Sequence, residues 1–113
     1  MARRTALNPY VIMWSYVMFD LPVVTVPERK QATAFRNFLL DLGFEMAQYS
    51  VYVKHHPTRE RAHSVLQRLP ATLPLGGKVD ILLVTDKQFR DIISFSGAVR
   101  QKKGRKDLQL HLF

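Results

Sequence analysis

The chain of 113 residues contains no cysteine, which excludes disulfide frameworks, thiolate metal sites and cysteine nucleophiles. It also lacks an apolar run long enough to cross a membrane. The uncharged stretch from Thr5 to Phe19 is interrupted by Pro9 and ends at Asp20, short of the roughly 18 residues that a spanning helix needs. No A-x-A cleavage pattern follows the basic pair near the start. We therefore expect neither export nor membrane insertion, and a cytoplasmic location.

Acidic residues are few compared with basic ones. There are 9 Asp and Glu residues against 17 Lys and Arg, which gives a formal net charge of +8. Such a surplus on a small protein favours a polyanionic partner, with nucleic acid ahead of an anionic membrane. Charge alone leaves open a protein that is merely basic. The hydrophobic content of 47% is typical of a globular protein, and the length allows one domain.

The first half of the chain predicts a strand, a helix and a pair of strands. Residues 11–19 form an apolar, β-branched and aromatic run bounded by prolines, which favours a buried strand. Thr25 and Glu28 have the spacing of a capping box, and the helix that they begin should end at Gly43. The strand-like segment 44–54 is too long for one straight strand, so we expect a bend near its middle.

The second half predicts another helix and further strands. Thr58 caps an amphipathic helix, and residues 78–85 form a strong strand pattern followed by a helical turn at 86–90. Residues 92–96 suggest a short last strand, and 108–112 alternate like an edge strand. The order β-α-β-β-α-β with right-handed crossovers predicts an α+β, ferredoxin-like sandwich with an extra C-terminal strand.

The sequence also predicts how the chain is divided and whether it associates. We expect an N-terminal extension at 1–12, with Met13 a possible natural start, a ferredoxin-like domain at 13–96 and a basic tail at 97–113. The first strand carries apolar side chains on both of its sides. A sheet covered by helices on one face only should then be covered on the other face by a second subunit, so we predict a homodimer.

Asp20 is the candidate catalytic and metal-binding residue. It ends a hydrophobic strand, and carboxylates at strand ends supply the oxygen ligands that a hard cation such as Mg²⁺ prefers. One carboxylate is too few, and the sequence shows no second carboxylate near it in each subunit. A two-fold axis that paired the Asp20 side chains of two subunits would supply two. The alternative is a structural Asp20 that accepts backbone hydrogen bonds from the turn at Leu21-Pro22.

Basic residues on both helices and in the tail predict contacts with a phosphate backbone, and the alternative is that they are simply solvated. His55 and His56 are adjacent, should point to opposite faces of an extended segment, and are interpreted as a solvated loop pair rather than a metal site. The candidate nucleic-acid-binding residues are Arg29, Lys30, Arg36, Arg59, Arg61, Arg68, Arg100, Lys102 and Lys103.

With these residues placed, the chain resembles the CRISPR-associated endoribonuclease family Cas2, in the form found beside type II systems. The similarity covers roughly residues 13 to 96. The segments that carry it include Val17-Met-Phe-Asp-Leu-Pro22, Phe35-Arg-Asn-Phe-Leu39, Gln48-Tyr-Ser-Val-Tyr-Val53 and Thr85-Asp-Lys-Gln-Phe89.

The resemblance implies a ferredoxin-like homodimer that bridges dimers of the integrase Cas1, in a heterohexameric or heterotetrameric complex, on a double-stranded DNA protospacer. It also implies a Mg²⁺-dependent endonuclease that acts on single-stranded RNA or double-stranded DNA, with Asp20 binding the metal at the dimer axis. Phe19 and Tyr52 are then expected at the dimer interface. Met46 stands where many relatives have a basic residue, so the DNA-bridging adaptor is our first interpretation and the nuclease is the alternative.

Overall fold

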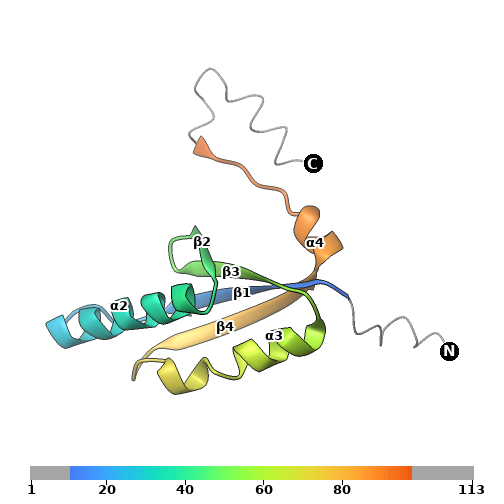
Figure 1. The fold of residues 1–113 in the computed structure, drawn as a ribbon. Helices are drawn as coiled ribbons and strands as arrows, with labels where there is room; N and C mark the ends of the chain where they lie inside the picture. The colour runs from blue at the N-terminus through green and yellow to red at the C-terminus, as the bar shows by residue number, and fades with distance from the viewer. Residues whose placement is uncertain (1–10, 98–113) are drawn as a thin grey trace.

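The computed structural model describes residues 11–97 and contains one four-stranded sheet in the order β2-β3-β1-β4, with every neighbouring pair antiparallel (Figure 1). This topology is that of the ferredoxin-like fold, so the predicted α+β class is confirmed. The elements are β1 (Met13–Asp20), α2 (Val26–Asp41), β2 (Glu45–Gln48), β3 (Val51–His56), α3 (Arg59–Leu66), a 3₁₀ turn η1 (Pro70–Thr72), β4 (Lys78–Thr85) and α4 (Asp86–Arg90).

Helix α2 begins and ends where its local signals predict. The Thr25 hydroxyl accepts a hydrogen bond from the backbone N–H of Glu28, and the Glu28 carboxylate accepts one from the backbone N–H of Thr25, which completes the capping box. Gly43 follows the helix with a φ of +100°, a left-handed conformation that glycine adopts without a steric cost. The predicted bend between two short strands is also confirmed, because β2 and β3 are joined by Tyr49 and Ser50.

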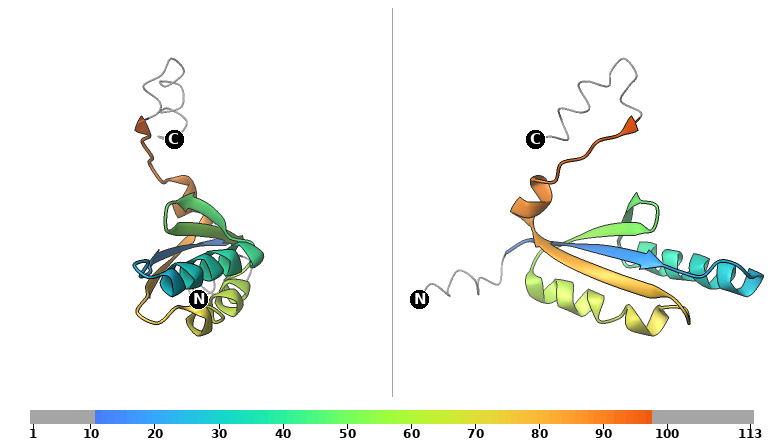
Figure 2. Two further views of the ribbon diagram at one scale, coloured as in Figure 1. Left: turned by 90° about the vertical axis from the view of Figure 1, so that its left-hand side faces the viewer. Right: turned by 180° about the vertical axis from the view of Figure 1, so that it is seen from behind.

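The core lies between the sheet and the two long helices. Figures 1 and 2 show α2 and α3 on the same face of the sheet. Val17 and Phe19 point from β1 towards Phe35 and Leu39 of α2, and Leu69, just after α3, closes the cluster. All five side chains are buried, and their burial is the main source of stability for a domain of this size.

The opposite face of the sheet is only partly covered by residues 11–97, and we call it the open face. In β1 it carries Trp14, Tyr16, Met18 and Asp20, which alternate with the buried residues of the core face. Helix α4 covers one end of it, since the Phe89 ring stacks on Trp14 with centroids 3.7 Å apart and planes within 4°. The Trp14 indole N–H donates to an Asp86 carboxylate oxygen at 2.8 Å.

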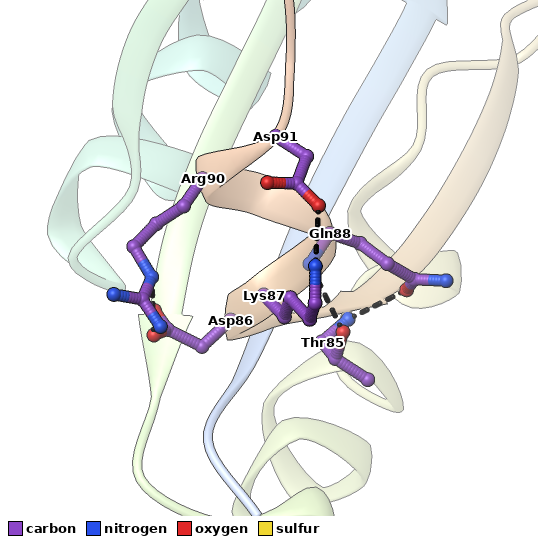
Figure 3. Close-up of polar contacts among 6 residues, drawn as sticks. All are labelled: Thr85, Asp86, Lys87, Gln88, Arg90 and Asp91. Carbon is purple, nitrogen blue, oxygen red and sulfur yellow. Dashed lines mark hydrogen bonds and ion pairs between the residues drawn. The ribbon is translucent and has the colours of Figure 1, made fainter. Parts of the chain in front are cut away.

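Helix α4 directs the chain away from the sheet. Its start is held by reciprocal hydrogen bonds between Thr85 and Gln88, and its exposed side by ion pairs that join Lys87 to Asp91 and Arg90 to Asp86 (Figure 3). The predicted strand at 92–96 is therefore wrong for the described part of the single subunit: these residues leave the sheet, and no strand of residues 11–97 lies beside them (Figure 1). A strand needs a hydrogen-bonding neighbour, and α4 places the segment out of reach of β4.

Some predictions lie outside the described residues. Most of the N-terminal extension, most of the basic tail and the strand expected at 108–112 belong to this group. Within residues 11–97, no helix is long and apolar enough to cross a membrane.

Candidate functional site

Asp20 is the last residue of β1, and its side chain is exposed on the open face. It lines a hollow of about 230 Å³ together with Met18, Phe19, Lys78 and Asp80. Within residues 11–97 its carboxylate makes no hydrogen bond or ion pair, so the alternative role in the Leu21-Pro22 turn is not observed. The carboxylate is available to a ligand.

The sheet register brings two charged residues of β4 to Asp20. Lys78 lies directly opposite Asp20, and Asp80 lies opposite Met18. Directly paired residues share a face, so all three charged side chains lie on the open face. The Lys78 ammonium is 3.6 Å from an Asp80 carboxylate oxygen. The expectation that no second carboxylate lies near Asp20 within a subunit is therefore wrong, because the sequence does not fix the register between β1 and β4.

The spacing Lys78-x-Asp80 was a usable signal, since alternate residues of a strand share a face. It predicts that Lys78 and Asp80 lie together. It does not predict that Asp20 joins them, because that contact depends on the long-range pairing of β1 with β4.

The oxygen donors at this hollow suit Mg²⁺ when a phosphate is also present. Diagonal positions on paired strands, such as Asp20 and Asp80, are about 7–8 Å apart, with their Cβ atoms somewhat closer, a span that two aspartate side chains can bridge to one cation. Mg²⁺ usually takes one or two carboxylates together with water and substrate phosphates. No group of three or more His, Asp or Glu side chains in the described part of the chain could hold a metal by itself. The residues therefore fit a metal only if water or phosphate oxygens complete its coordination.

The predicted basic residues of the helices lie on the other side of the sheet from Asp20. Three of them already have partners. Arg29 donates to the carbonyl oxygens of Val23 and Val24 at 3.2 and 2.9 Å, which holds the loop before α2. The Arg36 guanidinium lies 5.8 Å from the centroid of the Tyr49 ring. Arg68 was predicted on the second helix but lies in the turn after α3, and its guanidinium is 5.6 Å from the centroid of the Phe38 ring.

The remaining helix residues of this set, Lys30, Arg59 and Arg61, are exposed. None of the six basic residues predicted on the helices forms a salt bridge within residues 11–97. Their charges are therefore not compensated by carboxylates, which suits contact with a phosphate backbone. Arg100, Lys102 and Lys103 lie outside the described residues.

Phe19 and Tyr52 lie in the core and not on a surface. Their rings are 5.5 Å apart, and the Phe19 ring meets Phe35 of α2 edge to face at 5.3 Å. Only 7% of Phe19 and 4% of Tyr52 is exposed, so neither side chain offers contact area to a second subunit. The strand period explains this position, because both residues alternate onto the face that the helices cover.

The two adjacent histidines point to opposite faces as expected, but they are not a solvated loop pair. Both belong to β3. His56 is buried, and its Nε2 forms a hydrogen bond of 2.7 Å with the Ser15 hydroxyl, which is also buried. Burial, with a smaller effect of the charges of Lys54 and His55, lowers the pKa of His56 to about 4. Because Ser15 and His56 are both buried, this neutral pair is not accessible to a substrate and has a structural role in the core.

These features define a small ferredoxin-like α+β protein with an exposed strand-end aspartate and uncompensated basic helices. The family model described as "CRISPR associated protein Cas2" matches residues 13–92. The chain belongs to the CRISPR-associated protein Cas2 family.

Several relatives carry the name "CRISPR-associated endoribonuclease Cas2". The protein from Paracidovorax avenae is 47% identical over 107 residues, which cover 95% of this chain and 99% of the relative. The protein from Flavobacterium psychrophilum is 41% identical over 109 residues, with coverage of 96% and 95%. Among solved structures, Streptococcus pyogenes Cas2 at pH 6.5 matches with a TM-score of 0.57 and 18% identity, over 74% of this chain and 99% of that one. This last similarity supports the fold.

Proposed function

We propose that this protein is a cytoplasmic CRISPR adaptation subunit: a homodimer that binds double-stranded DNA and bridges dimers of the integrase Cas1 during spacer acquisition. The complex would be heterohexameric or heterotetrameric. Family membership gives the biological setting. The observation that carries the DNA-binding part is a set of six basic side chains, five on α2 and α3 and Arg68 just after α3, none of which forms a salt bridge within the described residues.

Two features of the sheet support a homodimer. Leu82 is 52% exposed on the open face, beside Tyr16, its direct partner in the register. Strand β4 is eight residues long and has no strand on its outer side within residues 11–97. Beyond it, Ile93 and Phe95 are 57% and 73% exposed. A second copy would bury this apolar surface and pair the free edge, which a stable monomer would not leave open.

The adaptor proposal is tested by mixing the full-length chain with its integrase partner and duplex DNA and measuring the mass of the complex by size-exclusion chromatography with light scattering. We expect the chain by itself to be a dimer, and the mixture to form a larger assembly that contains both proteins and DNA. The double variant Arg59→Gln/Arg61→Gln should make the negative slope of log affinity against log salt shallower by about 1.8, since each lost phosphate contact removes about 0.9. Glu60→Gln, between them on α3, is the matched control. A monomer that binds neither the integrase nor the DNA would contradict the proposal.

The second candidate function is a Mg²⁺-dependent endonuclease, which the name of the relatives suggests and which Asp20 and Asp80 favour. When bound, Mg²⁺ would activate water and neutralise charge that develops on the phosphate. In this chain, Asp20 and Asp80 would hold the cation, and Lys78 would stand beside it on the same face.

Asp20→Ala separates the two functions. If the protein is an adaptor only, this variant assembles and supports integration like the original chain. If the protein is a nuclease, the variant loses cleavage of single-stranded RNA or duplex DNA and keeps its affinity for the partner. Asp41→Ala, an exposed aspartate at the end of α2, is the matched control. Cleavage that survives both Asp20→Ala and chelation would come from a contaminating nuclease and would count against the endonuclease.

A further inference from the structure

Lys78 is the basic residue that the fold places beside Asp20. It begins β4, and the register makes it the direct partner of Asp20 at the end of β1. Its side chain is 75% exposed, and it lines the same hollow as Asp20 and Asp80. Helices α2 and α3, which carry Arg29, Lys30, Arg36, Arg59 and Arg61, form the layer at the opposite side of the sheet, and Arg68 follows α3 (Figure 2). These six basic residues do not line this hollow.

The charges of the hollow define what Lys78 can do. Two carboxylates and one ammonium line it, and a phosphodiester that approaches Asp20 meets repulsion from both carboxylates. Lys78 is the cation among the residues that line the hollow. Its ammonium carries three donors on a flexible stem, so it can follow a phosphate oxygen without a fixed geometry. The ion pair with Asp80 is long, at 3.6 Å, and both side chains are mostly exposed, so it is easily exchanged for another anion.

We propose that Lys78 positions a backbone phosphate over the Asp20 hollow, and that the phosphate replaces Asp80 as the partner of the ammonium when nucleic acid binds. Lys78 is then a phosphate-positioning residue that serves both candidate functions. It brings the strand to Asp20 in a nuclease, and in an adaptor it adds a contact with DNA on the open face, separate from the contacts of the helix layer. The inference rests on the proposed binding of nucleic acid.

The test measures the affinity of the full-length chain for a mixed-sequence DNA duplex between 50 and 200 mM salt. Lys78→Gln should lower the slope of log affinity against log salt by about 0.9, so that the loss of affinity over this range becomes about 3.5-fold smaller than for the original chain. Lys78→Arg keeps the charge and should restore the slope. Lys87→Gln is the matched control, because Lys87 is another exposed lysine, 80% exposed and paired with Asp91.

Asp80→Asn tests the exchange of partners. Removal of this carboxylate frees the ammonium of Lys78, so Asp80→Asn should raise DNA affinity more in the original chain than in the Lys78→Gln background. An equal effect in both backgrounds would overturn the exchange. Thermal melts of each variant confirm that the fold is retained.

The outcomes separate this inference from the proposed function. If the original chain does not bind the duplex, both are overturned. If the original chain binds and Lys78→Gln keeps its salt slope, the assignment of Lys78 is wrong while DNA binding stands. If Lys78→Gln and Lys87→Gln reduce the slope equally, the effect belongs to overall charge and the site at Lys78 is again overturned.

Discussion

The buried pair of Ser15 and His56 predicts a specific dependence of stability on pH. In the folded chain the pKa of His56 is lowered to about 4, first by burial and then by the charges of Lys54 and His55. In the unfolded chain the imidazole titrates near 6.5. The unfolded state therefore binds more protons than the folded state at every pH between these values. The stability that neutral His56 contributes is fully present above pH 6.5 and is lost as the pH falls towards 4.

The two pKa values fix the size of the effect. At about 1.4 kcal/mol for each pKa unit, the difference between them corresponds to roughly 3 kcal/mol over the whole range. At pH 5 the loss is about 2 kcal/mol relative to neutral pH, because the folded imidazole is still neutral there while the unfolded one is charged. This is a large share of the stability of a small domain.

The assay is urea denaturation at pH 8 and pH 5, with the protein concentration held constant because association changes apparent stability. His56→Gln keeps a polar partner for Ser15 but does not titrate. We expect its free energy of unfolding to fall by about 2 kcal/mol less than that of the original chain between these two pH values. His63→Gln, on the exposed side of α3, should behave like the original chain. Parallel losses in His56→Gln and the original chain would refute the reasoning.

Two further predictions concern α2 and α4. Thr25→Ala removes the hydroxyl that accepts a hydrogen bond from the backbone N–H of Glu28, and it should lower the free energy of unfolding by about 1 kcal/mol in a thermal melt. Thr33→Ala, at an exposed position of the same helix, should not lower the stability. Equal melting temperatures for Thr25→Ala and the original chain would contradict the capping role. Phe89→Ala uncovers Trp14, the single tryptophan, and should shift its fluorescence to longer wavelength. An unchanged emission spectrum would show that α4 does not remain stacked on Trp14 in solution.

Local signals predicted most of the elements correctly. The capping residues before α2 and α3 and the glycine after α2 act within a few residues of the backbone that they satisfy, so they can be identified without knowledge of the fold. The strand at 78–85 was also found with its observed bounds, because its run of aliphatic and β-branched residues and the Gly76-Gly77 turn before it are local. The segment 92–96 failed for the opposite reason: its composition suits a strand, but a strand also requires a neighbour.

The candidate site shows the same difference between what local signals predict and what depends on strand pairing. Asp20 was found because a carboxylate at the end of an apolar strand is visible in the sequence. Lys78 and Asp80 were not assigned to it, because β1 and β4 are far apart in the chain and only their antiparallel register makes Lys78 the partner of Asp20.

The burial of individual core residues also depended on tertiary contacts that the sequence does not show. His56 looked like one half of a solvated pair until β3 placed it against Ser15, and Phe19 and Tyr52 were expected at an interface until the helices covered them. By itself, the sequence determined the order of the elements, their caps and the excess of basic charge, because these depend on nearest neighbours and on composition. The tertiary structure alone decided which charges meet at the Asp20 hollow and which polar groups are buried, because those contacts form only when distant strands pair and one face of the sheet is closed by helices.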